Sequence, residues 1–323
     1  MSCSLLKVED FSLWFTKGAE KVRVLNSFSL EIEKGEVYSL VGASGSGKSI
    51  FLKSILRLLP GNAIIDGRIL FDGVDLVGLP ENRLNLVRGK RISIVFQDPM
   101  SSLNPTMKVG EQVAEVLRAN RFLDKKDIRR MVVEMFEEVG LKDPEMVYEM
   151  YPHQLSGGMR QRVMIAMALI GNPELILLDE PTTALDVTIQ AGILELIRRE
   201  ITAKGISSIF VTHDFSVVYS IADRVGVIFR GVLVEEAKKD DIFKNPLHPY
   251  TVALMEAIPK PVKGKFNLRF GEIPSQYGMS YKGCPFYEYC DIRVEDCRFD
   301  LPPMVDLGGG HRVRCFSLNY RRG

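Results

Sequence analysis

The sequence predicts an α/β fold, in which helices cover a mostly parallel β-sheet, followed by a smaller loop-rich region. Short apolar runs alternate with helical segments from residue 1 to about 243, which is the pattern of parallel strands joined by crossover helices. A glycine-rich loop at residues 42–49 directly follows one of these runs. After residue 243 the composition changes, because residues 244–323 hold eight of the 16 prolines and four of the five cysteines.

The expected elements follow one another along the first 243 residues. The run 36–41 is rich in apolar residues and predicts a buried strand. Helical periodicity extends from residue 48 to residue 59, where Pro60 and Gly61 end it. Helical periodicity with many charges over residues 110–148 predicts a small helical subdomain inserted between strands. Further apolar strands are expected at residues 91–96, 175–178 and 207–211.

Composition narrows the class of protein. The 323 residues suffice for one large domain or two modest ones, and 46% hydrophobic with 26% charged residues is ordinary for a soluble globular protein. A formal net charge of +1 gives no electrostatic reason to expect nucleic acid as a partner. No apolar run approaches the roughly 20 residues of a membrane span, and the first residues lack a signal-peptide pattern. We therefore expect a cytosolic protein that reaches a membrane only through partners.

The loop at residues 42–49 matches the phosphate-loop pattern G-x-x-x-x-G-K-[ST]. Its glycines let backbone N–H groups close around phosphate oxygens, Lys48 reaches the terminal phosphates, and Ser49 binds Mg²⁺. The residues expected to bind ATP here are Gly42, Ser44, Gly45, Ser46, Gly47, Lys48, Ser49 and Ile50.

A second anion-binding arrangement stands at Leu155-Ser156-Gly157-Gly158-Met159, where a serine and two glycines open a helix. The alternative is that Ser156 only caps this helix. Two such loops about a hundred residues apart in one chain favour a nucleotide bound between two copies of the domain.

Two carboxylates end the apolar run 175–178. Asp179 is placed to hold Mg²⁺ through water, as in other phosphate-loop enzymes. Glu180 is the next residue and suits the orientation and deprotonation of the attacking water. The alternative is a solvated acidic turn, which the phosphate loop earlier in the same strand–helix pattern makes the weaker interpretation.

In this order, the motifs resemble those of the ATPase subunit of ABC transporters over the first 240 residues. The resemblance implies an ABC-type domain at 1–243 with a RecA-like parallel-sheet core, a β-subdomain and a helical subdomain at about 98–160. It implies hydrolysis of ATP, with Mg²⁺ bound by Ser49, Gln97 and Asp179. It also implies that Ser156, Gly157 and Gly158 contact the γ-phosphate of a nucleotide bound by the other subunit.

The resemblance assigns roles to further residues that are weak signals alone. Gln97, after the strand 91–96, corresponds to the hinge residue that contacts Mg²⁺ and water and responds to the membrane subunit. His213 corresponds to the histidine that contacts the γ-phosphate, and residues 184–186 to the loop that crosses the dimer interface. Adenine is expected to stack on Phe15, with Trp14 as the competing candidate.

A finer resemblance is to the ATPases of dipeptide and oligopeptide importers. It rests on residues 87–89, on Gln97-Asp98-Pro99-Met100-Ser101-Ser102-Leu103-Asn104-Pro105 and on Asn245-Pro246-Leu247-His248-Pro249-Tyr250-Thr251. The details resemble the D-type subunit, which works beside an F-type ATPase. The resemblance implies two transmembrane permease subunits, an extracytoplasmic solute-binding protein and a place at the cytoplasmic face of the membrane.

The sequence leaves alternatives for the second ATPase subunit, for the transported substrate and for the class of ABC ATPase. The two ATPase subunits could be different chains or two copies of this one. Relatives with the same motifs import nickel complexes or oligosaccharides instead of peptides. A soluble, non-transport ABC ATPase would show a coiled-coil insertion, two cassettes in one chain or a strongly basic surface, and the sequence has none of these features.

The region 244–323 has a cysteine spacing of Cys284-x₅-Cys290-x₆-Cys297-x₁₇-Cys315. Loop-rich chain of this kind makes a poor hydrophobic core, so a metal is expected to hold it together. The gaps are not the close pairs of common structural zinc sites. Some of the importer ATPases that it resembles bind a 4Fe–4S cluster through four such thiolates, which implies a small metal-binding domain. Zn²⁺ and free or disulfide-bonded cysteines are the alternatives.

Overall fold

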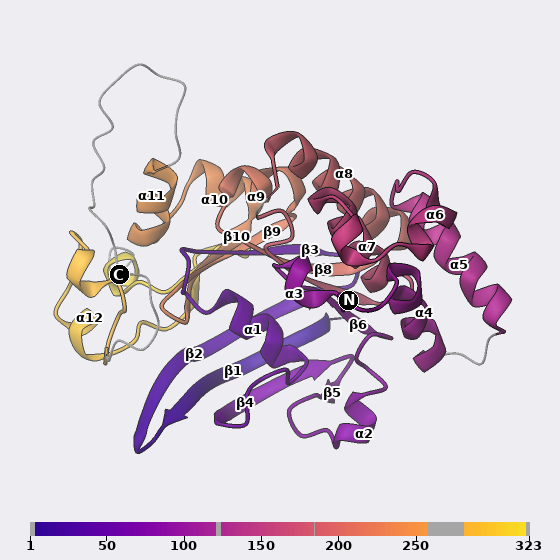
Figure 1. Cartoon of the computed structure of the whole chain (residues 1–323). Helices are drawn as coiled ribbons and strands as arrows, with labels where there is room; N and C mark the ends of the chain where they lie inside the picture. Colours follow the sequence, from indigo (N-terminus) through magenta and orange to yellow (C-terminus); the bar gives the residue numbers. More distant parts are fainter. Residues whose placement is uncertain (1–3, 121–123, 184, 258–280, 321–323) are drawn as a thin grey trace. The chain divides into compact units, whose positions relative to one another are not determined.

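The computed structural model describes residues 4–120, 124–183, 185–257 and 281–320 (Figure 1). The chain divides into two compact units. Unit 1 comprises Glu33–Glu36 and Gly78–Phe210, and unit 2 comprises Ser4–Ile32, Val37–Val77 and the described part of Val211–Gly323.

Unit 2 contains an antiparallel sheet with the strand order β2-β1-β4-β5. Its long strands lie side by side in Figure 1. The register of β1 against β4 shifts between Glu9 and Ser12. Gly67 lies opposite this shift with a φ of +89°, and a Cβ there would come within 2.5 Å of the Asp10 carbonyl oxygen. The strands are β1 (Ser4–Lys17), β2 (Glu20–Glu33), β4 (Ala63–Phe71) and β5 (Val74–Asp75).

Unit 2 also contains part of a second sheet, and this part has the strand order β11-β12-β10-β9-β3. Only β3 and β9 are parallel, whereas the β9–β10, β10–β12 and β12–β11 pairs are antiparallel. The mostly parallel sheet expected from the sequence is therefore mixed. Its strands are β3 (Val37–Val41), β9 (Arg224–Phe229), β10 (Val232–Lys238), β11 (Val305–Asp306) and β12 (Arg312–Val313).

The helix after β3 is shorter than its sequence pattern predicts. We expected it to reach residue 59, but α1 spans Lys48–Ile55. Arg57 takes a left-handed φ of 51°, and the Leu58 N–H donates to the Lys53 carbonyl at 2.8 Å, which closes the last turn. The other helices of unit 2 before the cysteines are α9 (Phe215–Ile221), α10 (Lys239–Lys244) and α11 (Pro249–Glu256).

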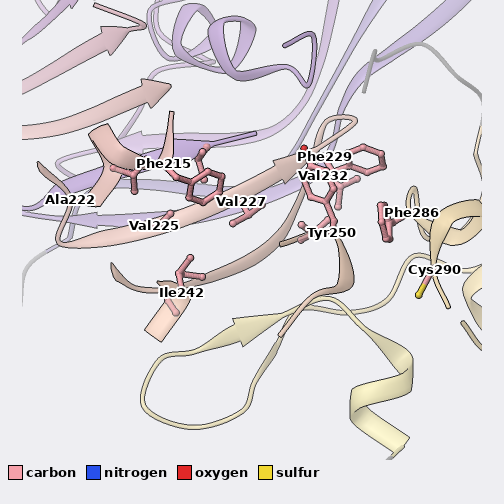
Figure 2. Packing of buried hydrophobic residues seen from close by; sticks show 14 residues of the cluster. Phe215, Ala222, Val225, Val227, Phe229, Val232, Ile242, Tyr250, Phe286 and Cys290 are labelled. Atoms are coloured by element: carbon pink, nitrogen blue, oxygen red, sulfur yellow. The ribbon is translucent and has the colours of Figure 1, made fainter. Parts of the chain in front are cut away.

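Buried apolar side chains form one cluster between the second sheet and the helices of unit 2 (Figure 2). Val227 and Phe229 from β9 pack there with Phe215 from α9 and Tyr250 from α11. Phe286 and Cys290, from the cysteine-bearing segment, complete the same cluster. The segment is thus packed on the sheet by apolar contacts. Its elements are η2 (Tyr287–Tyr289), α12 (Asp296–Phe299), α13 (Phe316–Tyr320) and strands β11 and β12.

Unit 1 combines parallel strands with helices. β6 (Ile92–Val95) and β7 (Leu175–Asp179) are parallel, with Ile92 opposite Leu175, and β8 (Ser207–Thr212) begins beside β7. These positions agree with the predicted apolar runs. Among the described residues, no helix is long and apolar enough to cross a membrane. The helices are α2 (Glu81–Leu84), α3 (Pro99–Ser102), α4 (Val109–Asn120), α5 (Lys125–Glu138), α6 (Pro144–Glu149), η1 (Pro152–Gln154), α7 (Gly157–Leu169) and α8 (Val187–Lys204).

Candidate functional site

The loop between β3 and α1 is buried at both ends and exposed at its tip, at Ser44 and Gly45. Gly42 has no room for a side chain, because a Cβ there would come within 2.2 Å of the Ile228 carbonyl oxygen. Gly45 and Gly47 have φ values of 76° and 106°, which favour glycine. Gly47 precedes α1, and no side chain caps that helix start. The loop therefore has the backbone shape of a phosphate-binding loop.

Lys48 is folded back into this loop. It is 4% exposed, and its Nζ donates to the carbonyl oxygens of Gly42 at 2.8 Å and Ala43 at 2.9 Å. Of the other predicted ATP-binding residues, Ser46 is buried, Ser44 and Gly45 are exposed, and Ser49 and Ile50 are half-buried.

In unit 1, the predicted catalytic residues lie around the carboxyl end of β7, which carries two acidic side chains. Asp179 and Glu180 are 3% and 9% exposed. The Gln97 Nε2 donates to the Glu180 Oε2 at 3.4 Å, and the Thr183 hydroxyl donates to the same oxygen at 2.9 Å. Glu180 has a left-handed φ of 44°, a strained conformation that is common at functional sites. Because β6 and β7 are parallel, their carboxyl ends bring Gln97 and Glu180 together.

Ser156 is the N-cap of α7, as the alternative interpretation predicts. Its hydroxyl oxygen accepts a hydrogen bond from the Met159 N–H at 3.3 Å. A serine hydroxyl that accepts one bond still has a proton to donate, so capping does not prevent contact with a phosphate. Gly158 is buried, and a Cβ there would lie 3.0 Å from the Ile189 Cγ2. The roles of Ser156, Gly157 and Gly158 stay predictions.

The remaining predicted nucleotide contacts lie in unit 2. His213 directly follows β8 and is exposed. Trp14 and Phe15 are both half-buried on β1, and the Arg23 guanidinium lies 5.5 Å from the centre of the Trp14 ring. Successive strand residues point to opposite faces, so only one of these rings can stack on a given base. Both stay candidates. Ala184, at the predicted interface loop, lies outside the described residues.

The four clustered cysteines are free thiols, three of them buried and Cys284 half-buried. Burial raises the pKa of Cys284 to about 12, with smaller increases from Cys297, Cys290 and Cys315. Burial likewise raises the pKa of Cys290 to about 11. In the part of the chain that the structure describes, however, no three His, Cys, Asp or Glu side chains are arranged to hold a metal ion. The metal site expected in the cysteine-bearing region is therefore not shown by the described residues.

Sequence reasoning missed a buried polar network around Glu235 of β10. Glu235 has no exposed surface, and it accepts hydrogen bonds from the Leu247 N–H at 2.8 Å and the His248 N–H at 2.9 Å. Its Oε1 lies 2.7 Å from the His311 Nε2. Burial lowers the pKa of His248 to about 4, so this ring is neutral at pH 7. The network joins β10 to both the segment before α11 and the cysteine-bearing segment.

A second missed feature is a contact between α11 and the phosphate loop. The Ala43 N–H donates to the Tyr250 hydroxyl oxygen at 3.2 Å. Burial raises the pKa of Tyr250 to about 12, so the hydroxyl keeps its proton at pH 7. Residues 245–251 stood out in the sequence only as a family motif, and nothing in their pattern indicates that Tyr250 reaches a loop 207 residues away.

A phosphate loop after a buried strand, together with an acidic strand end and a second glycine loop, defines an ATPase of the ATP-binding-cassette class. Residues 25–183 match the family model described as ABC transporter. Residues 234–297 match the model described as oligopeptide/dipeptide transporter, C-terminal region. The chain belongs to the ABC transporter family, in the branch of peptide-transport ATP-binding proteins.

Individual relatives are similar in sequence to this chain over nearly its whole length. The oligopeptide transport ATP-binding protein AppD of Bacillus subtilis is 42% identical over 97% of this chain and 96% of its own. The dipeptide transport ATP-binding protein DppD of the same organism is 41% identical over 98% and 96%. Among solved structures, a dimeric post-hydrolysis state of the cassette MJ0796 bound to ADP and Pi has a TM-score of 0.66 and 30% identity, and it covers 72% of this chain and 98% of that chain.

Proposed function

We propose that this chain is the ATP-hydrolysing subunit that powers the import of di- or oligopeptides through a membrane ABC transporter. The observation that carries this proposal is the identity of about 40% with peptide-transport ATP-binding proteins along the full chain, including the match of residues 234–297 to their C-terminal region. The proposed partners are a second, F-type ATPase subunit or a second copy of this chain, two transmembrane permease subunits and an extracytoplasmic solute-binding protein.

In the proposed mechanism, two cassettes enclose ATP. Lys48 and the backbone of the phosphate loop bind the phosphates of one nucleotide, and His213 contacts its γ-phosphate. The second cassette contributes Ser156, Gly157 and Gly158 to the same nucleotide. The solved cassette MJ0796 is dimeric with ADP and Pi bound, which supports this arrangement. Such a subunit would associate with the cytoplasmic face of the membrane through the permeases.

Glu180 is the proposed general base. It accepts a proton from the attacking water while the water oxygen bonds to the γ-phosphorus and the bond to the β,γ-bridging oxygen breaks. Gln97, already within hydrogen-bond distance of Glu180, orients this water. Mg²⁺ would be held by Ser49, Gln97 and Asp179, because hydroxyl, amide and carboxylate oxygens are the ligands that it prefers, and it would neutralise phosphate charge.

The test is to reconstitute the chain in vesicles with the permeases and the solute-binding protein encoded beside its gene. We expect ATP hydrolysis to rise when di- or oligopeptides are supplied to the binding protein, and not when oligosaccharides or nickel complexes are supplied. Stimulation by either of these instead of peptides would contradict the substrate while leaving the ATPase role intact. Failure to assemble with any permease would favour a non-transport ATPase.

We also propose that Cys284, Cys290, Cys297 and Cys315 hold a 4Fe–4S cluster. The support is the donor set, since four thiols gather in one segment. Backbone N–H groups of Phe286 and Ile292 bond to two of their sulfur atoms, as second-shell donors to thiolate ligands do. The cluster would join loop segments that have little apolar core.

Purification without oxygen tests this proposal. We expect coloured protein that contains iron and sulfide in comparable amounts, and loss of both after Cys297→Ser. The variant should destabilise the cysteine-bearing segment before it slows ATP hydrolysis. Colourless anaerobic protein with one bound zinc would contradict the cluster and indicate a zinc module, and metal-free protein with full stability would contradict both.

A further inference from the structure

One residue of the phosphate loop, Ala43, is held from two directions. The Ala43 carbonyl accepts hydrogen bonds from within the loop, from the Ser46 N–H at 3.2 Å and the Lys48 Nζ at 2.9 Å. The Ala43 N–H donates outside the loop, to the Tyr250 hydroxyl at 3.2 Å. Ala43 therefore connects the loop to α11.

The Tyr250 hydroxyl is rigidly placed. Tyr250 is 2% exposed, and its own N–H donates to the His248 Nδ1 at 3.1 Å, which caps α11. His248 in turn is held by Glu235 through its backbone N–H. A hydroxyl fixed in this way can bind a backbone N–H without first losing side-chain freedom.

Aromatic packing ties the same ring to the cysteine-bearing segment. The Tyr250 ring centre lies 4.4 Å from that of Phe229 and 5.6 Å from that of Phe286. Phe286 stands between Cys284 and Cys290 and has no exposed surface. Figure 2 shows the three rings gathered at one end of the cluster. A continuous set of contacts therefore runs from the cysteine-bearing segment to the phosphate loop.

Lys48 supports the same part of the loop. Its Nζ bonds to the Gly42 and Ala43 carbonyls. An ammonium group has three protons to donate, so a lysine that holds the loop can also contact a phosphate. The Ala43 N–H bond to Tyr250 involves no atom of Lys48, so it supports this part of the loop independently of the lysine.

We propose that Tyr250 is a positioning residue for nucleotide binding, which fixes Ala43 and makes nucleotide affinity depend on the packing of the cysteine-bearing segment. The inference rests on the proposed role of residues 42–49 in binding phosphate. Tyr250 does not contact the nucleotide in this account. It acts only through the backbone of the loop.

The direct test is Tyr250→Phe in the full chain, because this change keeps the ring and removes the hydroxyl. Because this change removes one neutral hydrogen bond that supports the loop, we expect the Kd for ATP to rise about 3- to 10-fold. Amide hydrogen exchange at Ala43 should become faster in the nucleotide-free protein, a change that a purely global effect on stability would not confine to this residue. Tyr148→Phe is the matched control, since it removes a tyrosine hydroxyl that donates to Glu111 in the helical part of unit 1.

A second variant tests the link to the cysteine-bearing segment. Phe286→Leu keeps an apolar side chain but removes the ring that packs on Tyr250, and we expect a smaller rise in the Kd for ATP together with faster exchange at Ala43. Lys48→Ala distinguishes this inference from the proposed function. If Lys48→Ala abolishes ATP binding while Tyr250→Phe leaves both Kd and exchange unchanged, the role of Tyr250 is wrong and the phosphate loop stands. If Lys48→Ala has no effect, the proposed site itself is wrong.

Discussion

Glu180→Gln yields a protein that binds ATP but hydrolyses it about 10²- to 10⁴-fold more slowly, the usual cost of losing a general base. Glutamine has nearly the same shape and keeps one side-chain oxygen for the Thr183 hydroxyl, which now bonds to the Glu180 carboxylate at 2.9 Å. It cannot accept the proton of the attacking water at pH 7. Phosphate release from the assembled transporter measures the rate, and ATP binding measured separately confirms that the site still forms.

The matched control is Glu174→Gln, just before β7 at the opposite end of the same strand. Glu174 pairs with Arg91, with the Arg91 Nη2 2.9 Å from its Oε2, and has no proposed contact with nucleotide. Pairs that are partly exposed contribute about 0–1 kcal/mol, so this change should leave hydrolysis within a few-fold of the original rate. Hydrolysis at the original rate by Glu180→Gln would remove Glu180 from the proposed mechanism.

Glu235→Ala destabilises the protein by about 3–5 kcal/mol, because it removes the acceptor of a buried network and leaves its donors without a partner. The donors that lose it are the Leu247 and His248 N–H groups and the His311 ring. Since His248 also caps α11, the loss should extend to the start of that helix. Urea unfolding measures the free energy of unfolding, and limited proteolysis detects release of the segment after residue 281.

Asp240→Ala provides the comparison for this variant. Asp240 lies close to Glu235 in the sequence and pairs with Lys244 at 3.1 Å, but both side chains are more than half exposed. An exposed pair of this kind contributes about 0–1 kcal/mol. If Glu235→Ala lowered the free energy of unfolding by less than about 1 kcal/mol, as Asp240→Ala is expected to do, the network would not be what holds the segment in place.

The sequence predicted best the elements whose burial is nearly complete. Strands β3, β7 and β8 are buried at every position, so they appear as short, largely apolar runs, and the predicted catalytic and phosphate-binding residues lie at or just after their ends. The proximity of Gln97 and Glu180 follows from parallel strands ending at one edge. The early end of α1 depends on the backbone conformation of Arg57, for which arginine gives no signal.

The features that the sequence did not reveal depend on contacts between distant residues. β12 pairs with β10 through Glu235 opposite Val313 and Glu236 opposite Arg312, and a strand of two residues has no detectable periodicity. Two adjacent glutamates would also suggest an exposed strand, whereas both are buried here by partners far along the chain. Tyr250 illustrates the same limit, because its hydroxyl partner is a backbone N–H rather than a recognisable side chain.

The pairing of β12 with β10 also bears on solubility. An exposed edge strand can pair with the edge of another molecule and lead to aggregation. In unit 2, β12 covers the edge of β10, and the outermost strand is then β11, which has only two residues. Pro302 and Pro303 precede β11 and the charged Asp306 ends it, and short strands flanked by proline and charge are poor templates for further pairing. A chain shortened before residue 281 would uncover the edge of β10 at Glu235 and Glu236, so we expect it to self-associate more readily than the full chain.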